Sequence, residues 1–123
     1  MSTFGQRIRP AVDAELRAAA AMEARADQSR CFRHLERAHV LGQASTVQHV
    51  RVHMHMLLWA IRHRVFREAT GQVLRIVGAA TKTAIGWVPT GNTGGSNISP
   101  FKPLPIPADL QQQLTNVRSR DGR

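Results

Sequence analysis

A chain of 123 residues has the size of one domain and is too short for two separate cores. Its 17 Lys and Arg side chains against 8 Asp and Glu give a formal charge of +9, so the surface should attract anions. The alternative is that this charge serves only solubility, since the arginines are spread along the chain. Cys31 is the single cysteine, which excludes an internal disulfide and a cysteine-only zinc site.

Neither export nor membrane insertion is expected from the sequence. The first ten residues contain Arg7 and Arg9 but lack the apolar core of a signal peptide. The longest apolar stretches, residues 56–61 and 76–88, are too short to span a bilayer or are interrupted by Lys82. Together with the lone cysteine, these features predict a cytoplasmic protein without a membrane partner.

Apolar side chains at helical spacing predict two helices in the first third of the chain. The first covers residues 10–26, which contain no glycine. Asp27 is the expected N-cap of the second helix, and Gly42 is the expected C-terminal stop. The apolar positions are Ala11, Ala14, Ala18 and Met22 in the first helix, and Cys31, Phe32, Leu35 and Ala38 in the second.

Two further helices follow and complete a second hairpin. Ser45 with Gln48 three residues later has the form of a capping box, which predicts the start of a third helix. The break before the fourth helix falls either at residues 63–65 or at residues 70–71. Val73, Val77, Ala80 and Ala84 mark the fourth helix, which is expected to end at Gly86 or shortly after. Residues 1–88 therefore predict an all-α fold, a small bundle of about four helices in two hairpins.

The composition changes in the last third of the chain. Residues 89–107 contain five of the six prolines and a run rich in glycine and asparagine, yet they carry apolar side chains such as Ile98 and Phe101. We expect a Pro/Gly-rich extended C-terminal arm, packed on the same domain or on a second subunit as a homodimer contact. Pro107 suits a first helical position, so a short helix should follow within residues 89–123.

Two histidines of the third helix fall on its apolar arc. His49 and His53 are four residues apart and therefore stack on one face, the spacing at which two imidazoles reach one ion. His55 projects toward the charged side instead. The run from His53 to Met56 is consequently not a copper-binding cluster, because successive helical residues splay apart.

The first two helices also place ionisable side chains at expected core positions. His39 lies in the middle of the second helix's apolar stripe, and Glu36 lies three residues earlier on its edge. This Glu-x-x-His form is the one that four-helix carboxylate proteins use to direct both ligands into a bundle. Glu15 occupies a core position of the first helix, where a lone carboxylate is costly unless it is paired or bound to a cation.

The convergence of these five residues predicts a metal site whose ligands are Glu15, Glu36, His39, His49 and His53. Nitrogen and carboxylate ligands without thiolate suit iron or zinc, with manganese, nickel or copper as alternatives. A di-iron bundle normally has two Glu-x-x-His motifs, and only one is present. The alternative is a structural network in which the same groups hydrogen-bond to one another. If the protein is an enzyme, an open metal position would activate water or dioxygen, but the sequence names no reaction.

The glycine-rich run suggests a second kind of site. Backbone N–H groups at Gly94 and Gly95 and the amides of Asn92 and Asn97 can surround an anion or a small anionic ligand, although a structural turn is the favoured interpretation of the run. The competing function for the whole chain is a basic module that binds nucleic acid or another polyanion while the histidines are structural.

Several of these motifs occur together in one known family. The run from Leu35 to Gln43, the two histidines that follow, the segment from Gly86 to Gly95 and the proline-rich run from Pro103 to Pro107 resemble the bacterial family catalogued as domain of unknown function 3703. The resemblance covers most of the chain from Cys31 to about Leu110. It implies no reaction or cofactor, but it suggests that the helical histidines and the arm belong to one pattern, with the arm closing over the site.

Overall fold

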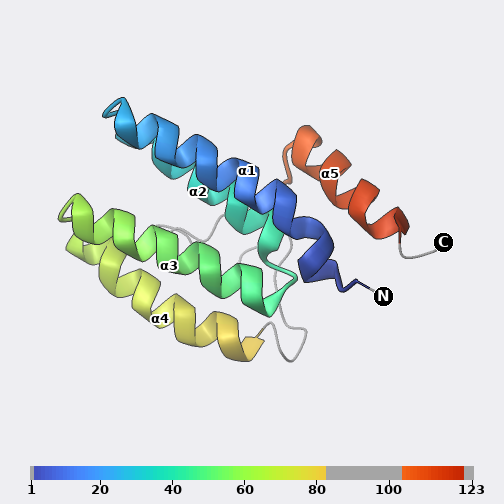
Figure 1. Ribbon diagram of the computed structural model, residues 1–123. Helices are drawn as coiled ribbons and strands as arrows, with labels where there is room; N and C mark the ends of the chain where they lie inside the picture. Colours follow the sequence, from blue (N-terminus) through green and yellow to red (C-terminus); the bar gives the residue numbers. More distant parts are fainter. Residues whose placement is uncertain (1, 83–103, 121–123) are drawn as a thin grey trace.

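The chain is all-α in the part that the computed structural model describes, which comprises residues 2–82 and 104–120 (Figure 1). These residues form five helices rather than about four, because the short helix expected after Pro107 is a 12-residue helix that packs on the bundle. The predicted arm between residues 89 and 103 lies outside the described residues. The helices are α1 (Phe4–Ala24), α2 (Gln28–Gly42), α3 (Thr46–Arg62), α4 (Phe66–Lys82) and α5 (Ala108–Ser119).

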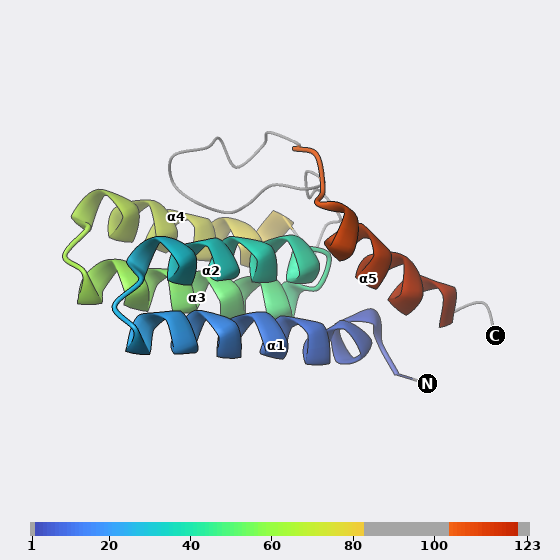
Figure 2. The same cartoon turned by 90° about the horizontal axis from the view of Figure 1, so that it is seen from above.

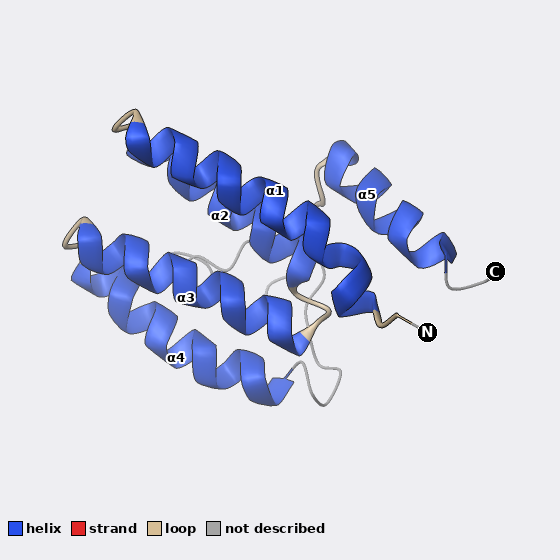
Figure 3. Cartoon of the chain, in the orientation of Figure 1, coloured by secondary structure: helices blue, strands red, loops and turns tan. Residues whose placement is uncertain are grey.

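The first four helices form two antiparallel hairpins joined through α2 and α3. Helices α1 and α2 pack along each other, as do α3 and α4, and α2 lies against α3 between them (Figure 2). Helix α5 packs on α1 and α2, whereas α4 has α3 as its only helical neighbour in the described part. Short loops connect the first four helices (Figure 3). Among the described helices, none is both long enough and apolar enough to cross a membrane.

The predicted starts of α2 and α3 are confirmed by their caps. The Asp27 carboxylate accepts a hydrogen bond from the backbone N–H of Arg30 at 3.0 Å, and the Ser45 hydroxyl accepts one from the N–H of Gln48 at 3.3 Å. Each side chain satisfies one of the backbone donors that a helix leaves unpaired in its first turn. These two caps fix where the histidine-bearing helices begin.

Helix α1 begins six residues earlier than its apolar pattern predicts. The Thr3 hydroxyl accepts from the N–H of Gln6 at 3.2 Å, and the Gln6 side chain accepts from the N–H of Thr3 at 2.8 Å, which completes a capping box. Pro10 therefore lies inside the helix rather than at its start. Proline lacks an N–H and crowds the preceding turn, and the first turns of α1 bend away from the remainder of the helix (Figure 1).

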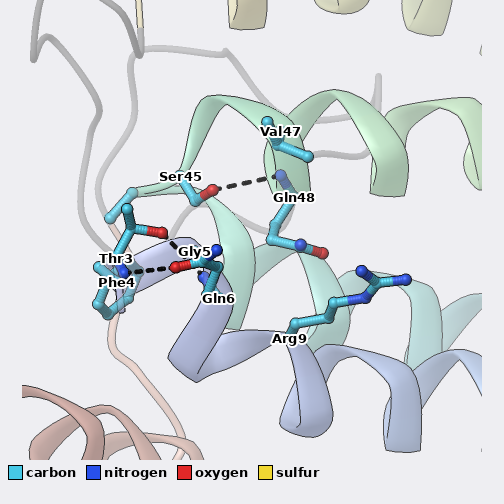
Figure 4. Close-up of a pocket in the computed structure, with 9 residues that line it drawn as sticks. Thr3, Phe4, Gly5, Gln6, Arg9, Ser45, Val47 and Gln48 are labelled. Carbon is cyan, nitrogen blue, oxygen red and sulfur yellow. Dashed lines mark hydrogen bonds between the residues drawn. The ribbon is translucent and has the colours of Figure 1, made fainter. Parts of the chain in front are cut away.

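The starts of α1 and α3 meet at one end of the molecule, where they line a pocket (Figure 4). Gly5 lies against Ser45 so closely that an added Cβ would stand 2.5 Å from the serine hydroxyl oxygen. A side chain at position 5 would therefore push the Ser45 cap out of place. The glycine is required here by close approach of the two helices.

The break between α3 and α4 falls at residues 63–65, the first of the two expected places. Arg64 adopts a left-handed backbone with φ of 58°, and the N–H of Val65 donates to the carbonyl of Ala60 at 2.8 Å. This closes α3 in the manner of a helix C-terminal motif with a non-glycine residue in the left-handed position. The expected end of α4 at Gly86 lies outside the described residues.

The core is built from α1, α2, α3 and α5. Its fully buried side chains include Ile8 and Val12 of α1, Leu41 of α2, Met56 of α3 and Leu110 of α5. The predicted stripe of α1 is wrong by about one position, because Ala14 is exposed whereas Leu16 and Ala19 are buried. Large aliphatic side chains, rather than the commoner alanines, decide which face of α1 turns inward.

Helix α4 is oriented opposite to its apolar pattern. Val73 and Val77, expected to mark its buried stripe, are 51% and 65% exposed, while Glu68 and Gln72 are buried. Periodicity shows that one face of a helix is apolar, but it does not show which face points inward. The inward face of α4 includes the polar Gln72 because this side chain bonds the buried His53 described next.

Candidate metal centre

Three histidines meet in the interior between the two hairpins. His39 comes from α2, and His49 and His53 come from α3; their side chains are 3%, 8% and 2% exposed. Each offers one ring nitrogen, and these three nitrogens lie within 4.8 Å of one another. The ring centroids are 4.7 to 4.8 Å apart. No second group of three His, Cys, Asp or Glu residues with this geometry occurs among residues 2–82 and 104–120.

Two of the three rings form a direct hydrogen bond. The Nε2 atoms of His39 and His49 are 2.8 Å apart, so one ring donates a proton that the other accepts. Two nitrogen ligands of a tetrahedral zinc ion stand about 3.3 Å apart, given Zn–N bonds of about 2.0 to 2.1 Å. A separation of the rings by about half an ångström, with loss of the shared proton, would therefore let the pair act as two ligands of one ion.

The third ring is oriented by a hydrogen-bond chain from α4. The Gln72 amide nitrogen donates to the Glu68 carboxylate at 2.8 Å, which turns the amide oxygen toward His53. That oxygen accepts a hydrogen bond from His53 Nδ1 at 2.6 Å. The proton therefore sits on Nδ1, and Nε2 keeps the lone pair that a metal requires. Partners of this kind fix the tautomer and orientation of metal-ligating histidines.

The pKa of His53 falls from 6.5 to about 4 because burial disfavours the charged imidazolium. The hydrogen bond to Gln72 works in the opposite direction, and the nearby charges of Arg75 and Glu68 oppose each other. The ring is thus neutral throughout the physiological pH range. A neutral imidazole is the form in which histidine binds metals.

The residues of α4 that support His53 are missed by the sequence pattern. Gln72 is fully buried and Glu68 is 9% exposed. The only sequence signal for this pair is its spacing of four residues, which places both side chains on one face of a helix. The apolar stripe on the opposite face of α4 conceals that signal, because such a stripe normally marks the buried side.

Glu15 is buried, as expected, but it belongs to a different cluster. Its carboxylate accepts a hydrogen bond from Arg37 Nε at 3.0 Å and contacts His34 Nδ1 at 2.7 Å. Both partners lie on α2, and Arg37 also pairs with Asp109 of α5. The structure thus places Glu15 in an ion-pair cluster that ties α1, α2 and α5 together rather than among the three histidines.

Glu36 is half-buried and also lies outside the group of three histidines. It lines a pocket with neighbouring arginines of α2 and with Leu104, Pro105 and Leu110 on the α5 side. A spacing of three residues separates two helical side chains by about 60° around the axis, enough to direct Glu36 and His39 to different neighbours. The Glu-x-x-His form therefore does not bring both side chains to one place here.

Of the remaining residues singled out from the sequence, the structure describes Cys31 and His55 but not those of the expected anion site. Cys31 is 4% exposed, and burial raises the pKa of its thiol to about 11, so it is a neutral core side chain. His55 points outward as expected. The anion-binding residues Asn92, Gly94, Gly95 and Asn97 lie outside the described residues.

Comparison with known proteins gives one match. The sequence model of a family described as a protein of unknown function, DUF3703, matches residues 6–114. No curated protein and no solved structure matches the chain significantly. The match covers the helices that carry the three histidines and Gln72. The chain belongs to the DUF3703 family.

Proposed function

We propose that this protein binds one transition-metal ion through His39, His49 and His53. The observation that carries the proposal is the convergence of three buried imidazole nitrogens within 4.8 Å of one another. Three large polar rings in a small core are costly to bury unless their nitrogens are satisfied. A metal ion would take one nitrogen from each of the three rings, whereas the His39–His49 hydrogen bond joins two of them.

The ligand set favours zinc. Imidazole ligands suit zinc, copper and nickel, whereas manganese prefers carboxylate and water oxygens. Non-haem iron sites commonly add a carboxylate to two histidines, and the two carboxylates expected from the sequence lie outside the three-histidine group. Of the two metals that the sequence favours, zinc therefore fits this centre better than iron.

Three protein ligands leave one tetrahedral position for water or another ligand, as in catalytic zinc sites. Zinc lowers the pKa of such a water toward neutrality and supplies a nucleophile for hydration or hydrolysis. Glu68, linked to His53 through Gln72, contributes a negative charge near the centre. Arg75 places an opposing positive charge nearby, so Glu68 alone does not offset the cost of placing a dication in the core.

The proposal is tested by elemental analysis of full-length protein purified without a histidine tag and after reconstitution with zinc. We expect about one metal ion per chain in the wild type and in His55→Ala, whose ring points outward. The double variant His39→Ala/His53→Ala should contain none. Gln72→Leu should keep its three ligands but bind zinc about 10- to 100-fold more weakly, because His53 loses the partner that orients it.

Two carboxylate variants decide the roles of the expected acidic ligands. Glu15→Gln and Glu36→Gln should each retain zinc, and loss of the ion in either would make that residue a ligand. A wild-type protein that neither carries nor takes up zinc, copper, nickel or iron would refute metal binding. Binding of a polyanion that weakens steeply with added salt would then support the basic-module function.

A further inference from the structure

Helix α4 turns its polar face inward and its apolar face outward. Phe66, Val73, Leu74 and Val77 are 51 to 70% exposed, whereas Glu68 and Gln72 are buried and Gln72 bonds His53. A helix at the surface of a monomer normally has the opposite arrangement. Helix α4 also packs only on α3 among the described helices. Within residues 2–82 and 104–120, no second helix covers this outer face.

Helix α3 extends this surface. Val52, Met56 and Ala60 of α3 face the first hairpin and are fully buried, while Met54, Leu58 and Ile61 lie on the other side of the helix. The two helices run side by side (Figures 1 and 3). Every large hydrophobic side chain that is exposed in the described part belongs to this hairpin. We call the set the α3–α4 face: Val47, Met54, Leu58, Ile61, Val65, Phe66, Val73, Leu74 and Val77.

The size of this surface matches that of a protein interface. Nine large side chains that are 39 to 72% exposed present on the order of 800 Å² of apolar surface, about what each partner contributes to a stable interface. The largest apolar patch on a typical monomer is about 300 to 600 Å². The α3–α4 face is therefore large enough to hold a dimer together.

Two of the arginines at its edge pair with carboxylates of the first hairpin. Arg51 reaches back to Asp13 of α1 at 2.6 Å, and Arg62 reaches back to Glu23 at 3.5 Å. The positive charges on this edge of α3 are thus partly neutralised within the chain. The nine side chains of the face are uncharged, although the exposed Arg67 lies beside Phe66 and seven residues before Leu74. An apolar surface of this kind is complementary to a second copy of itself.

We propose that the protein forms a symmetric homodimer in which the α3–α4 faces of two copies pack together. The apolar residues recur at spacings of three, four and seven along both helices, the pattern of helices that pack in bundles. Two antiparallel hairpins joined by a two-fold axis give a four-helix bundle, with the histidine centres on its outer sides. This interface differs from the arm-mediated contact expected from the sequence.

The test is sedimentation velocity of the full-length chain over a range of concentrations. The wild type should sediment at twice the 13.6 kDa chain mass and dissociate on dilution. Val73→Glu/Val77→Glu places like charges across the two-fold axis and should weaken dimerisation by on the order of a hundredfold. The matched control, Ala14→Glu/Ala20→Glu, adds the same charge at exposed positions of α1 and should remain dimeric.

Far-UV circular dichroism checks that both variants are folded. If the α4 variant fails to fold, hydrogen exchange of the wild type gives the same information, because protection of α4 should rise with concentration while that of α1 stays constant. A wild type of 13.6 kDa at every concentration would overturn the proposal. So would a folded α4 variant that dimerises as well as the control, because the interface would then lie elsewhere.

Discussion

At the residue scale, His53 connects the stability of the protein to pH. Its pKa is 6.5 when exposed and about 4 in the fold, because burial disfavours the cation. Above pH 6.5 the ring is neutral in both states and contributes no pH dependence. As the pH falls from 6.5 to about 4, the unfolded chain binds a proton that the folded chain does not, so stability is lost over this window.

We therefore predict that the metal-free protein loses about 3 kcal/mol of unfolding free energy through His53 between pH 6.5 and 4. Urea unfolding at a series of pH values, with chelator present, measures this loss. His53→Gln has no proton to gain at this position and should show a shallower dependence over the same window. Parallel curves for the two proteins would contradict the assigned cause.

Much of the candidate site at this scale is predictable from the sequence. His39, His49 and His53 fall on apolar stripes, and all three are buried together. Glu15 also falls on a core position, but burial does not specify a partner, and Arg37 is nearer to it than any of the three histidines. Gln72 is not predictable because it lies opposite the apolar stripe of its own helix.

At the scale of elements, the turn between α2 and α3 positions two of the ligands. Gly42 is the last residue of α2, as expected, but it serves packing rather than a left-handed stop. A Cβ added there would stand 3.0 Å from the Gln48 Cβ and 3.4 Å from the Gln48 carbonyl carbon. The Gln48 backbone is held by the Ser45 cap and leads directly to His49.

Gly42→Ala should lower the unfolding free energy by about 1 kcal/mol, because the cost of overpacking exceeds the gain in helix propensity. Denaturant unfolding measures the change. The sign of the change in unfolding free energy shows whether the close contact is rigid. Without such a contact the same substitution inside a helix stabilises by up to about 1 kcal/mol. A stabilised variant would show that the α2–α3 turn shifts to accommodate the added methyl group. The zinc affinity should then be unchanged.

The ends of a helix are largely predictable where a capping residue marks them in the sequence. The caps at Asp27 and Ser45 act within four residues, so local sequence is sufficient to locate them. The start of α1 is missed because Pro10 is typical of a first turn, whereas the box formed by Thr3 and Gln6 overrides it. A strong cap therefore allows a helix to begin before a proline, and the helix then contains the proline in its first turns.

At the scale of the whole molecule, α5 joins the N-terminal helices into one core. Leu110 is fully buried and Leu114 is 3% exposed, both in the same cluster as side chains of α1 and α2. Asp109 at the start of α5 pairs with Arg37, which also binds Glu15 of α1. These contacts connect the end of the chain to its beginning.

Leu110→Ala should therefore destabilise the entire domain by about 2 to 5 kcal/mol, the usual cost of a large cavity in a core. Trp59 fluorescence in a Trp87→Phe background reports unfolding of α3, which does not contact α5. Its unfolding midpoint should fall in Leu110→Ala and stay nearly constant in the exposed Gln112→Ala variant. An unchanged midpoint in Leu110→Ala would show that α5 is a separate appendage.

The sequence by itself determines that the chain is helical, where α2 and α3 begin, and that three histidines face the interior, because periodicity and caps act over a few residues. Only the tertiary structure decides which face of α4 turns inward, since that depends on the polar partner that His53 of α3 offers to Gln72. It also separates Glu15 and Glu36 from the histidines, because pairing between helices is set by packing geometry that no single helix encodes.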